Sequence, residues 1–481
     1  MTSTTGGSVG LLERGRTDPA NRFTESALTI DNAVLPSWEL QSWLADRHAT
    51  NKFEVCRIPF ADMAQWHFQE GTGNLVHATG RFFSVEGLRV RTDYGPVPQW
   101  TQPIVNQPEV GILGIIVKEF GGVLHCLMSA KMEPGNVNTL QISPTVQATR
   151  SNYTRAHRGN ATAYLEHFAD RSRSRVLVDV LQSEQGSWFH RKANRNMVVE
   201  VTEDVEAGPD HCWLTLGQLL DLMRFDNLVN MDARTVLSCI PFAAAPGTGA
   251  GPFAQALTQS LSGDRSRYGM PEILSWFTEA KTRYFLSAER FPLAQIEGWK
   301  RTDTEVAHER GKFFKVMAVQ VNASNREVSQ WSQPLVEPVE HGLVALLVKR
   351  IDGVAHALMH VRVEAGYLDT IELAPTVQCT VSNYEGVPAS GRPPFLDEVL
   401  AAPRSRIRYD ALLSEEGGRF YHAQNRYQVI EVPDDFPLSV GPDFRWLTLH
   451  QLVELLRHSH YLNVQARSLV ASLHSLWAAQ P

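Results

Sequence analysis

The sequence predicts an α+β fold that is built twice, with a mixed or antiparallel sheet and flanking helices in each half. The first observation is an internal repeat. PTVQATRSNY at residues 144–153 returns as PTVQCTVSNY at residues 375–384, with eight of ten positions identical and an offset of 231. The second is that aromatic and β-branched runs bounded by turn residues fill each half. The third is that helical segments stand at the edges of both halves.

The offset of 231 is kept over more than a hundred residues. It carries WTQP at residue 100 onto WSQP at residue 331, and SEQG at residue 183 onto SEEG at residue 414. Such a constant offset indicates one ancestral module that was duplicated and fused. Each module is large enough for a core of its own. We predict a flexible leader at residues 1–35, a first module at residues 36–240, a linker at residues 241–269 and a second module at residues 270–475.

Strands and helices are expected in the same order in both modules. Residues 80–90 and 311–321 are aromatic and β-branched runs typical of strands. Residues 112–131 predict a hairpin around a Gly-Gly turn, and residues 343–364 predict its partner, because Asp-Gly between apolar runs favours a tight turn. Helices are predicted at residues 36–48 and 271–283, which open the modules, and at 213–225 and 446–458, which close them with a threonine as N-cap.

The composition is that of a soluble globular protein, with 43% hydrophobic and 20% charged residues. A formal net charge of −7 argues against a nucleic-acid-binding protein, although it leaves room for a local basic pocket. Five cysteines without a CxxC pattern predict neither a zinc knuckle nor a disulfide framework. Because no secretory signal and no membrane-spanning run is recognised, we expect a cytoplasmic protein that does not contact membranes.

A dense polar block follows a strand in both halves, at residues 149–153 and 380–384. Polar side chains at a strand end, followed by an aromatic ring, can hold a sugar and stack on a nucleobase. The alternative is a polar turn that only fixes the end of the strand. Retention of the block in both halves leaves these two interpretations balanced.

A second repeated block reads LQSEQGSWFHRKANRN at residues 181–196 and LLSEEGGRFYHAQNRY at residues 412–427. Ser-Glu-x-Gly predicts a tight turn that presents Glu184 or Glu415; the alternative is an exposed turn carboxylate without a role. The copies differ informatively, because the second has a carboxylate, an arginine and a phenol where the first has Gln185, Trp188 and His190. These three second-copy residues are Glu416, Arg419 and Tyr421.

Arg419 follows a pair of glycines, Gly417 and Gly418. Backbone N–H groups and a guanidinium fork can bind a diphosphate together. Lys131 and Arg362 stand at equivalent strand positions and could meet phosphate in the same way. Each is followed two residues later by a glutamate, so an internal ion pair is the alternative.

Trp66 and Trp299 open comparable segments and could stack on a nucleobase, with a role in the core as the alternative. His125 and His356 lie in the middle of hairpin strands, where a hydrogen-bonded core histidine is the favoured interpretation. The seventeen histidines are scattered along the chain, and no metal site is predicted.

The combination WTQPI, GILG, AKMEPGN, SPTVQATRSNY, VLQSEQG and NRN resembles the NDP-hexose 2,3-dehydratase family of deoxysugar biosynthesis, from about residue 40 to 475. The resemblance implies Nudix-like modules, a homodimer and dTDP-4-keto-6-deoxy-D-glucose as substrate, in the assembly of the 2,6-dideoxysugars of antibiotics. This chain lacks the acidic RExxEE run of Nudix hydrolases. The resemblance therefore implies neither magnesium-dependent diphosphate cleavage nor a metal requirement.

The implied chemistry is an elimination. A ketone at sugar carbon 4 acidifies the proton on carbon 3, and a base removes that proton to give an enolate. The hydroxyl on carbon 2 then leaves as water, and the enol product tautomerises to a 3,4-diketone. The reaction needs a base, an acid and donors at the enolate oxygen, but no redox cofactor. A separate NADPH-dependent 3-ketoreductase is the expected downstream partner.

Matching the family motifs predicts which residues contact the nucleotide sugar. We expect the second module to hold the working active site, with Glu416 as candidate base and Tyr421 as candidate acid; matched substitutions at Gln185 and Glu416 would decide between the modules. An epimerase or isomerase on the same sugar, or a non-catalytic nucleotide-sugar sensor, are the alternatives. The predicted contacts are Trp66, Thr149, Arg150, Ser151, Asn152, Tyr153, Trp299, Arg362, Gln378, Cys379, Thr380, Asn383, Tyr384, Glu416, Gly417, Gly418 and Arg419.

Overall fold

The computed structural model describes residues 18–32, 34–149, 162–245, 251–263, 265–326 and 328–479. Each half contributes one large sheet, and both sheets are mixed, as the sequence predicts. The first has the order β10 (Arg175–Ser183), β11 (Ala193–Glu200), β6 (Gly111–Phe120), β7 (Val123–Met132) and β12 (His211–Thr215), with β8 (Leu140–Ser143) beside β7 and β9 (Val146–Ala148) beside β6.

The second large sheet repeats this arrangement. Its order is β22 (Ile407–Ser414), β23 (Gln424–Glu431), β18 (Gly342–Ile351), β19 (Val354–Arg362) and β20 (Glu372–Ala374), with β21 (Val377–Cys379) beside β18 and β24 (Phe444–Thr448) beside β19. In each sheet one central pair is parallel, β6 with β11 and β18 with β23. The hairpin predictions are confirmed: β6–β7 turns at Gly121-Gly122, and β18–β19 turns at Asp352-Gly353, where φ is 50° and 79°.

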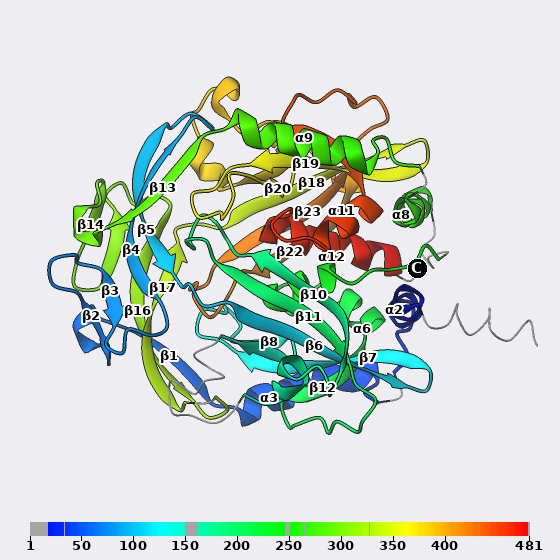
Figure 1. Ribbon diagram of the computed structural model, residues 1–481, viewed down its shortest axis with the longest axis horizontal. Helices are drawn as coiled ribbons and strands as arrows, with labels where there is room; N and C mark the ends of the chain where they lie inside the picture. The colour runs from blue at the N-terminus through cyan, green and yellow to red at the C-terminus, as the bar shows by residue number, and fades with distance from the viewer. Residues whose placement is uncertain are drawn as a thin grey trace, which may run out of the picture.

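Each half contributes one strand to a small sheet of the other half. β1 (Phe53–Ile58) of the first half pairs with β16 (Phe314–Ala323), in a small sheet with β15 (Glu305–His308), β14 (Trp299–Arg301) and β17 (Gln330–Pro338). In return, β13 (Leu286–Phe291) of the second half pairs with β4 (Ser84–Thr92), in a sheet with β3 (Leu75–His77), β2 (Trp66–Phe68) and β5 (Gln99–Asn106). Both small sheets lie at one end of the molecule, and the large sheets lie at the other (Figure 1).

The prediction of a flexible leader and a linker is wrong for two segments. α2 (Pro19–Ala27) and α8 (Pro252–Ser262) are helices at equivalent places in the two halves. Ser26 Oγ in α2 donates to the Leu124 carbonyl and accepts from the Leu216 amide, and Ser260 in α8 bridges Ala355 and Leu449 in the same way. These helices therefore belong to the packed modules, since each serine satisfies backbone groups of a strand and of a helix start.

The helices predicted at the module starts are confirmed as α3 (Ser37–Thr50) and α9 (Met270–Arg283). Those predicted at the module ends begin later than expected, as α6 (Leu216–Leu222) and α11 (Leu449–Leu456), because Trp-Leu-Thr completes strands β12 and β24. Thr215 and Thr448 are confirmed as N-caps, each in a capping box with a glutamine. Short helical turns complete the chain: η1 (Phe60–Asp62), α5 (Glu166–Ala169), η2 (Leu293–Gln295), η3 (Val381–Tyr384), η4 (Ala389–Gly391), α10 (Leu396–Leu400) and η5 (Arg404–Arg406).

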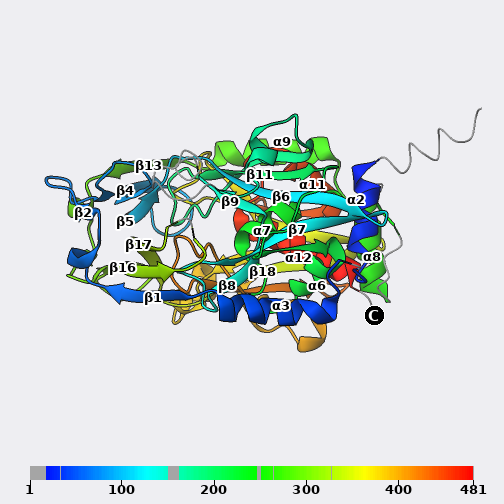
Figure 2. The same cartoon turned by 90° about the horizontal axis from the view of Figure 1, so that it is seen from below.

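The expectation of a core in each module is confirmed in part, since each half has a buried apolar cluster of its own and the halves also share a larger one. α7 (Met231–Ser238) packs against α12 (Val464–Ala478) between the two large sheets (Figures 1 and 2). One cluster of buried apolar side chains runs through this layer and includes residues of both halves, such as Ile115 and Val236 from the first and Val344 from the second. Two fully buried arginines add polar links: Arg234 donates to the Ser414 carbonyl and Arg467 to the Ser183 carbonyl. The halves thus share the core between their large sheets.

Within the described ranges, no helix is long and apolar enough to cross a membrane.

Candidate functional site

Two large cavities lie where the large sheet of one half meets strands and loops of the other half. Neither cavity belongs to a single module, contrary to the expectation of one pocket in each. The Lys131 pocket has a volume of about 820 Å³ and the Arg362 pocket about 720 Å³. Both volumes lie in the range of sites that enclose small organic ligands.

The Lys131 pocket has its floor on the first large sheet, at the ends of β7 and β9 and on β11, and one wall on β2, β3 and the loop before β4. The other wall comes from the second half: β17 and the loop at residues 416–419. Its lining includes Trp66, His77, Phe83, Gln107, Lys131, Glu133, Gln147, Thr149, Lys192, Asn194, Asp232, Arg326, Trp331, Gln333, Glu416, Gly418 and Arg419.

The Arg362 pocket is its counterpart with the roles of the halves reversed. Its floor lies on β19, β21 and η3 of the second half, and its far wall on β5 and residues 185–188 of the first. Its lining includes Trp100, Gln102, Gln185, Trp188, Trp299, His308, Phe314, Arg362, Glu364, Gln378, Cys379, Thr380, Asn383, Tyr384, Asn425 and Gln465.

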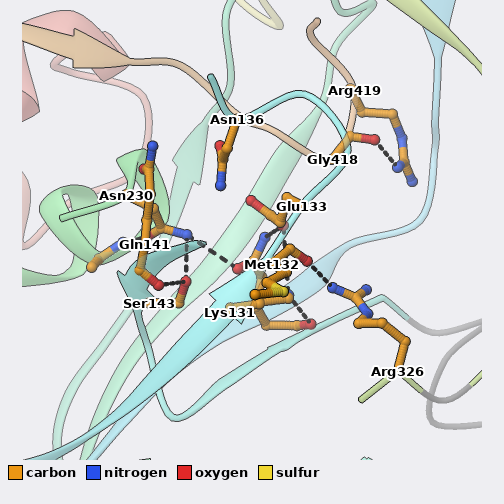
Figure 3. Close-up of polar contacts among 12 residues, drawn as sticks. Lys131, Met132, Glu133, Asn136, Gln141, Ser143, Asn230, Arg326, Gly418 and Arg419 are labelled. Carbon is orange, nitrogen blue, oxygen red and sulfur yellow. Dashed lines mark hydrogen bonds and ion pairs between the residues drawn. The ribbon is translucent and has the colours of Figure 1, made fainter. Parts of the chain in front are cut away.

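Both pockets share a polar floor. In one, Lys131 Nζ lies 3.7 Å from Glu133 Oε1, which also accepts a hydrogen bond from Gln147 Nε2 at 2.8 Å (Figure 3). In the other, Arg362 Nε donates to Glu364 Oε1 at 2.8 Å. The predicted ion pairs therefore form, and both basic residues also line a cavity. The acidic partner raises the pKa of Arg362 despite its burial, so this guanidinium stays charged.

The backbones of the two halves come into close contact at Gly135, and this contact holds the loop at residues 416–419 against the Lys131 pocket. The Gly135 amide donates to the Gly417 carbonyl at 2.8 Å. A Cβ on Gly135 would lie 1.7 Å from the Phe420 carbonyl oxygen, so only glycine permits this approach. Gly366 has the same relation to Phe189 on the other side. The tight turn predicted for Ser-Glu-x-Gly is thus anchored by the opposite module.

Glu416 reaches the Lys131 pocket from this loop, and its Oε2 has no hydrogen-bond partner. Burial and the neighbouring Glu184 raise the pKa of Glu416 to about 7, against the lowering effect of Arg419. Glu184 is itself buried, and its Oε1 accepts from Asn194 Nδ2 at 2.7 Å. The alternative of an exposed turn carboxylate is therefore wrong for Glu184, and equally for the buried Glu415.

Asp232 brings a further carboxyl to the Lys131 pocket from the first turn of α7. Its side chain is only 3% exposed, and Oδ1 has no hydrogen-bond partner. Burial, together with the nearby Glu416 and Glu184, raises its pKa well above the usual value. Lys192 lies in the same lining, and burial lowers the pKa of its ammonium group.

Arg419 is held in the wall of the Lys131 pocket by three contacts. Its Nε donates to Gln107 Oε1 at 3.0 Å, its Nη1 donates to the Gly418 carbonyl at 2.7 Å, and its guanidinium lies 4.4 Å from the centroid of the Phe83 ring. Arg326 lines the same pocket and donates to the Met132 carbonyl at 2.9 Å (Figure 3). These groups give the pocket several cationic side chains in one cavity.

The repeat allows the two linings to be compared position by position. Trp66, His77 and Phe83 correspond to Trp299, His308 and Phe314, and these rings pack on each other in the same way. Apart from the ion pair of the floor, the charged groups are not kept. Where the Lys131 pocket has Glu416, Asp232, Lys192 and Arg419, the other half has Gln185, Gln465, Ala423 and Trp188. The pockets therefore share a scaffold and differ in charged side chains.

The predicted contact residues divide between the two pockets. Trp66, Thr149, Glu416, Gly418 and Arg419 line the Lys131 pocket. A second group of predicted residues from the second half lines the Arg362 pocket. Contrary to expectation, these residues do not share a cavity with Glu416. This second group is Trp299, Arg362, Gln378, Cys379, Thr380, Asn383 and Tyr384. The predictions for Arg150, Ser151, Asn152 and Tyr153 fall outside the described residues.

Two predicted residues are placed elsewhere. Tyr421 lines neither pocket; its ring stacks on His422 at 4.0 Å, lies under the Arg57 guanidinium and packs on the small sheet. Residues 417–419 form a turn, after which the Tyr421 amide donates to the Val336 carbonyl of β17 at 2.7 Å, and this pairing carries the ring to the small sheet. Gly417 does not line the pocket either, since it makes the contact with Gly135. Trp66 is both a core residue and a lining residue, so its two interpretations are compatible.

Sequence reasoning missed Asp232, Lys192 and Gln107. Asp232 stands in an eight-residue helix that was not predicted, and its counterpart is Gln465, so the repeat gave no identical pair to notice. The informative signal was a difference between the copies, in which one copy has a carboxylate where the other has an amide, as at Glu416 and Gln185.

Comparison with known proteins adds an independent finding. The model of the NDP-hexose 2,3-dehydratase family matches residues 37–240 and again residues 270–473. A protein of Saccharopolyspora spinosa is 62% identical over 95% of both chains, and one of Amycolatopsis orientalis is 52% identical over 97% of this chain and 96% of its own. One of Streptomyces violaceoruber is 46% identical over 90% and 96%. All three are named dTDP-4-dehydro-6-deoxy-alpha-D-glucopyranose 2,3-dehydratase.

Proposed function

Since the chain belongs to the NDP-hexose 2,3-dehydratase family, we propose that it removes water from carbons 2 and 3 of dTDP-4-keto-6-deoxy-D-glucose in the Lys131 pocket. One observation carries the choice of pocket. Of the two cavities, the Lys131 pocket has the unpartnered carboxyl of Glu416, and the other has the amide of Gln185 at the equivalent place. An amide cannot accept a proton at neutral pH, so it cannot start this elimination.

Glu416 is the proposed base. A pKa of about 7 suits a group that must be ionised to take a proton and still be basic enough to do so. The substrate ketone at carbon 4 acidifies the proton on carbon 3, and Glu416 takes it. The active site is therefore composite: its base comes from the second half and its floor from the first. This replaces the expectation of a site within the second module.

The remaining lining supports binding of a nucleotide diphosphate. Lys131, Arg326 and Arg419 all line the cavity and bring positive charge to it, and diphosphate oxygens are bound well by such groups. Trp66 and Phe83 offer aromatic surface for the base. The Arg362 pocket keeps the shared floor with Glu364, but it has Gln185 and Gln465 where the Lys131 pocket has Glu416 and Asp232.

Several finer features follow from the family resemblance alone and are part of this proposal. They are a Nudix-like origin of the duplicated module, a homodimeric assembly, a cytoplasmic location and a role in making antibiotic deoxysugars. The 3,4-diketone product calls for an NADPH-dependent 3-ketoreductase as the next enzyme. No redox cofactor is proposed for this chain, because the elimination transfers no hydride.

The test is incubation of the purified protein with dTDP-4-keto-6-deoxy-D-glucose, a 3-ketoreductase and NADPH, followed by mass spectrometry. The expected product is the 2-deoxy nucleotide sugar, which has lost one oxygen. An isomer of unchanged mass would indicate an epimerase instead. Binding of the substrate with no turnover would indicate a sensor, and either result would contradict the proposal. Glu416→Gln is the matched negative control, since it copies the residue of the other half.

A further inference from the structure

The proposed elimination needs a proton for the hydroxyl that leaves carbon 2, and Tyr421 lies outside the pocket. The described lining of the Lys131 pocket contains three carboxyls: Glu133, Glu416 and Asp232. Glu133 belongs to the floor that both pockets share, with Oε1 held by Gln147 and Lys131. Glu416 is the proposed base. Asp232 is the carboxyl that has neither of these roles.

The position of Asp232 is fixed by the start of α7. The N-cap residue Asn230 accepts from the Ala233 amide at 2.8 Å and donates to Ser143 Oγ at 2.9 Å. The first turn of the helix is therefore tied to β8, which pairs with β7 of the pocket floor (Figure 3). Asp232 lies in this turn, is only 3% exposed, and has an Oδ1 without a protein partner at the cavity. Such an atom is available to a bound ligand.

The repeat supplies a second, independent observation. α12 begins at the equivalent N-cap, Asn463, and places Gln465 where α7 places Asp232. Gln465 lines the Arg362 pocket and also has an unpartnered side-chain oxygen. The two side chains are thus similar in shape and placement, but an amide cannot give up a proton as an acid. Two carboxyls of the Lys131 pocket, at residues 232 and 416, therefore stand at positions where the other pocket has amides.

The cations of the Lys131 pocket are less suited to this task. Lys192 Nζ donates to the Glu109 carbonyl, to Asn194 Oδ1 at 2.8 Å and to the Ala193 carbonyl at 3.4 Å, so its three protons already have acceptors. A guanidinium such as Arg419 does not release a proton in proteins. Both groups instead favour the ionised form of Glu416.

We propose that Asp232 is the catalytic acid that protonates the carbon 2 hydroxyl as it leaves. This inference rests on the function proposed above. In the step, the electron pair of the broken C3–H bond passes through the enolate and forms the new C2=C3 bond. The C2–O bond breaks at the same time. The departing hydroxyl takes the proton of Asp232 and leaves as water. The C3–H proton stays on Glu416. The enol then loses its hydroxyl proton and gains a proton on carbon 2, which restores both carboxyls without any redox change.

The electrostatics agree with these roles. Asp232 is buried among Glu416, Glu184 and Glu133, and each of these raises its pKa further. A raised pKa favours the protonated form of Asp232, which is the form that a catalytic acid must have before the step.

The first test separates proton removal from water loss. Wild type, Asp232→Asn and Glu416→Gln are incubated with dTDP-4-keto-6-deoxy-D-glucose in D2O; deuterium at carbon 3 is followed by NMR, and dehydration by mass. We expect Asp232→Asn to exchange the C3 proton while dehydration falls by about 10²–10⁴-fold. Glu416→Gln loses both. Dehydration by Asp232→Asn within about threefold of wild type, or loss of exchange in a folded variant that binds dTDP, would overturn the role of Asp232.

The second test uses a leaving group that needs no acid. With the 2-deoxy-2-fluoro analogue of the substrate, fluoride departs with its electron pair and without a proton. Fluoride release by Asp232→Asn is expected to stay within about threefold of wild type, whereas Glu416→Gln stays inactive. Equal defects of Asp232→Asn on both substrates would contradict the assignment. Asp232→Gln, which copies Gln465, replaces Asp232→Asn if that variant fails to fold. A wild-type protein that dehydrates neither substrate would overturn the proposed function and this inference with it.

Discussion

Gln185 Nε2 donates a hydrogen bond to Glu415 Oε2 at 2.7 Å across the boundary between the two halves. Both side chains are almost completely buried. The residues at the equivalent positions of the repeat are Glu416 and Glu184. Here one carboxyl lies near another, and Glu184 raises the pKa of Glu416. The same scaffold therefore holds a satisfied amide–carboxylate pair in one half and a mutually repelling pair in the other. Proteins tolerate such a local loss of stability mainly at functional sites.

Glu416→Gln should lower the activity of the protein and raise its stability. The glutamine can donate to Glu184 as Gln185 donates to Glu415, so we expect the free energy of unfolding at pH 7.5 to rise by about 1 kcal/mol. The rate of dehydration should fall by about 10²–10⁴-fold, because the base is lost. Urea unfolding and product formation measure the two quantities. A variant that is less stable than wild type would show that Glu416 is not strained by Glu184.

Gln185→Glu is the matched control in the other half. It replaces the donor to Glu415 by a second carboxyl, so we expect unfolding to become easier by about 1–3 kcal/mol. Dehydration per folded molecule should stay within about threefold of wild type, because the Lys131 pocket is unchanged. A loss of activity as large as that of Glu416→Gln would instead place the reaction in the Arg362 pocket.

The pH dependence of kcat/KM should report the ionisation of Glu416. Its pKa is raised to about 7, so activity is lost as the pH falls through this value and the base becomes protonated. The stability effect has the opposite sign: a carboxyl whose folded pKa exceeds its unfolded value stabilises at low pH, and this contribution is lost as the pH rises through 7. Glu184→Gln removes a raising neighbour and should move the acidic limb down by about one pH unit. An unmoved limb would assign it to another group.

Local sequence patterns predicted much of the fold. The Asp352-Gly353 turn, the Gly121-Gly122 turn and the threonine N-caps were all recognised, because each depends on backbone preferences of a few neighbouring residues. α7 and α12 were missed. α12 is buried on almost every side, so it has no polar face and no amphipathic period to detect.

The composite pockets could not be predicted from one module at a time. The exchange of β1 and β13 and the crossing at Gly135 and Gly417 depend on how the halves pack, which the repeat itself does not encode. Glu416 was singled out correctly as a lining residue, since its difference from Gln185 is visible in the sequence. The other residues of its cavity were expected to come from the second module, because residues of one module were expected to share a pocket.

Ser26→Ala should show that the first helix belongs to the fold. Its hydroxyl donates to the Leu124 carbonyl at 2.6 Å and accepts from the Leu216 amide at 2.9 Å, and alanine leaves both buried groups unpaired. We expect the free energy of unfolding to fall by about 2–4 kcal/mol. Glu25→Ala, at an exposed position of the same helix, should change it by less than about 0.5 kcal/mol. Equal stabilities of the two variants would support the leader that the sequence suggested.

His474 should contribute to unfolding in mild acid. It is fully buried in α12, neither ring nitrogen has a hydrogen-bond partner, and burial lowers its pKa to about 3. The unfolded chain binds a proton at this residue near pH 6.5, whereas the folded chain does not, so stability is present above pH 6.5 and falls as the pH drops towards 3. At pH 5 the loss from this one residue is about 2 kcal/mol. His474→Leu should remove it without destabilising the protein at pH 7.5. Urea unfolding of both proteins at the two pH values gives the difference, and equal pH dependence of the two would show that His474 is not responsible.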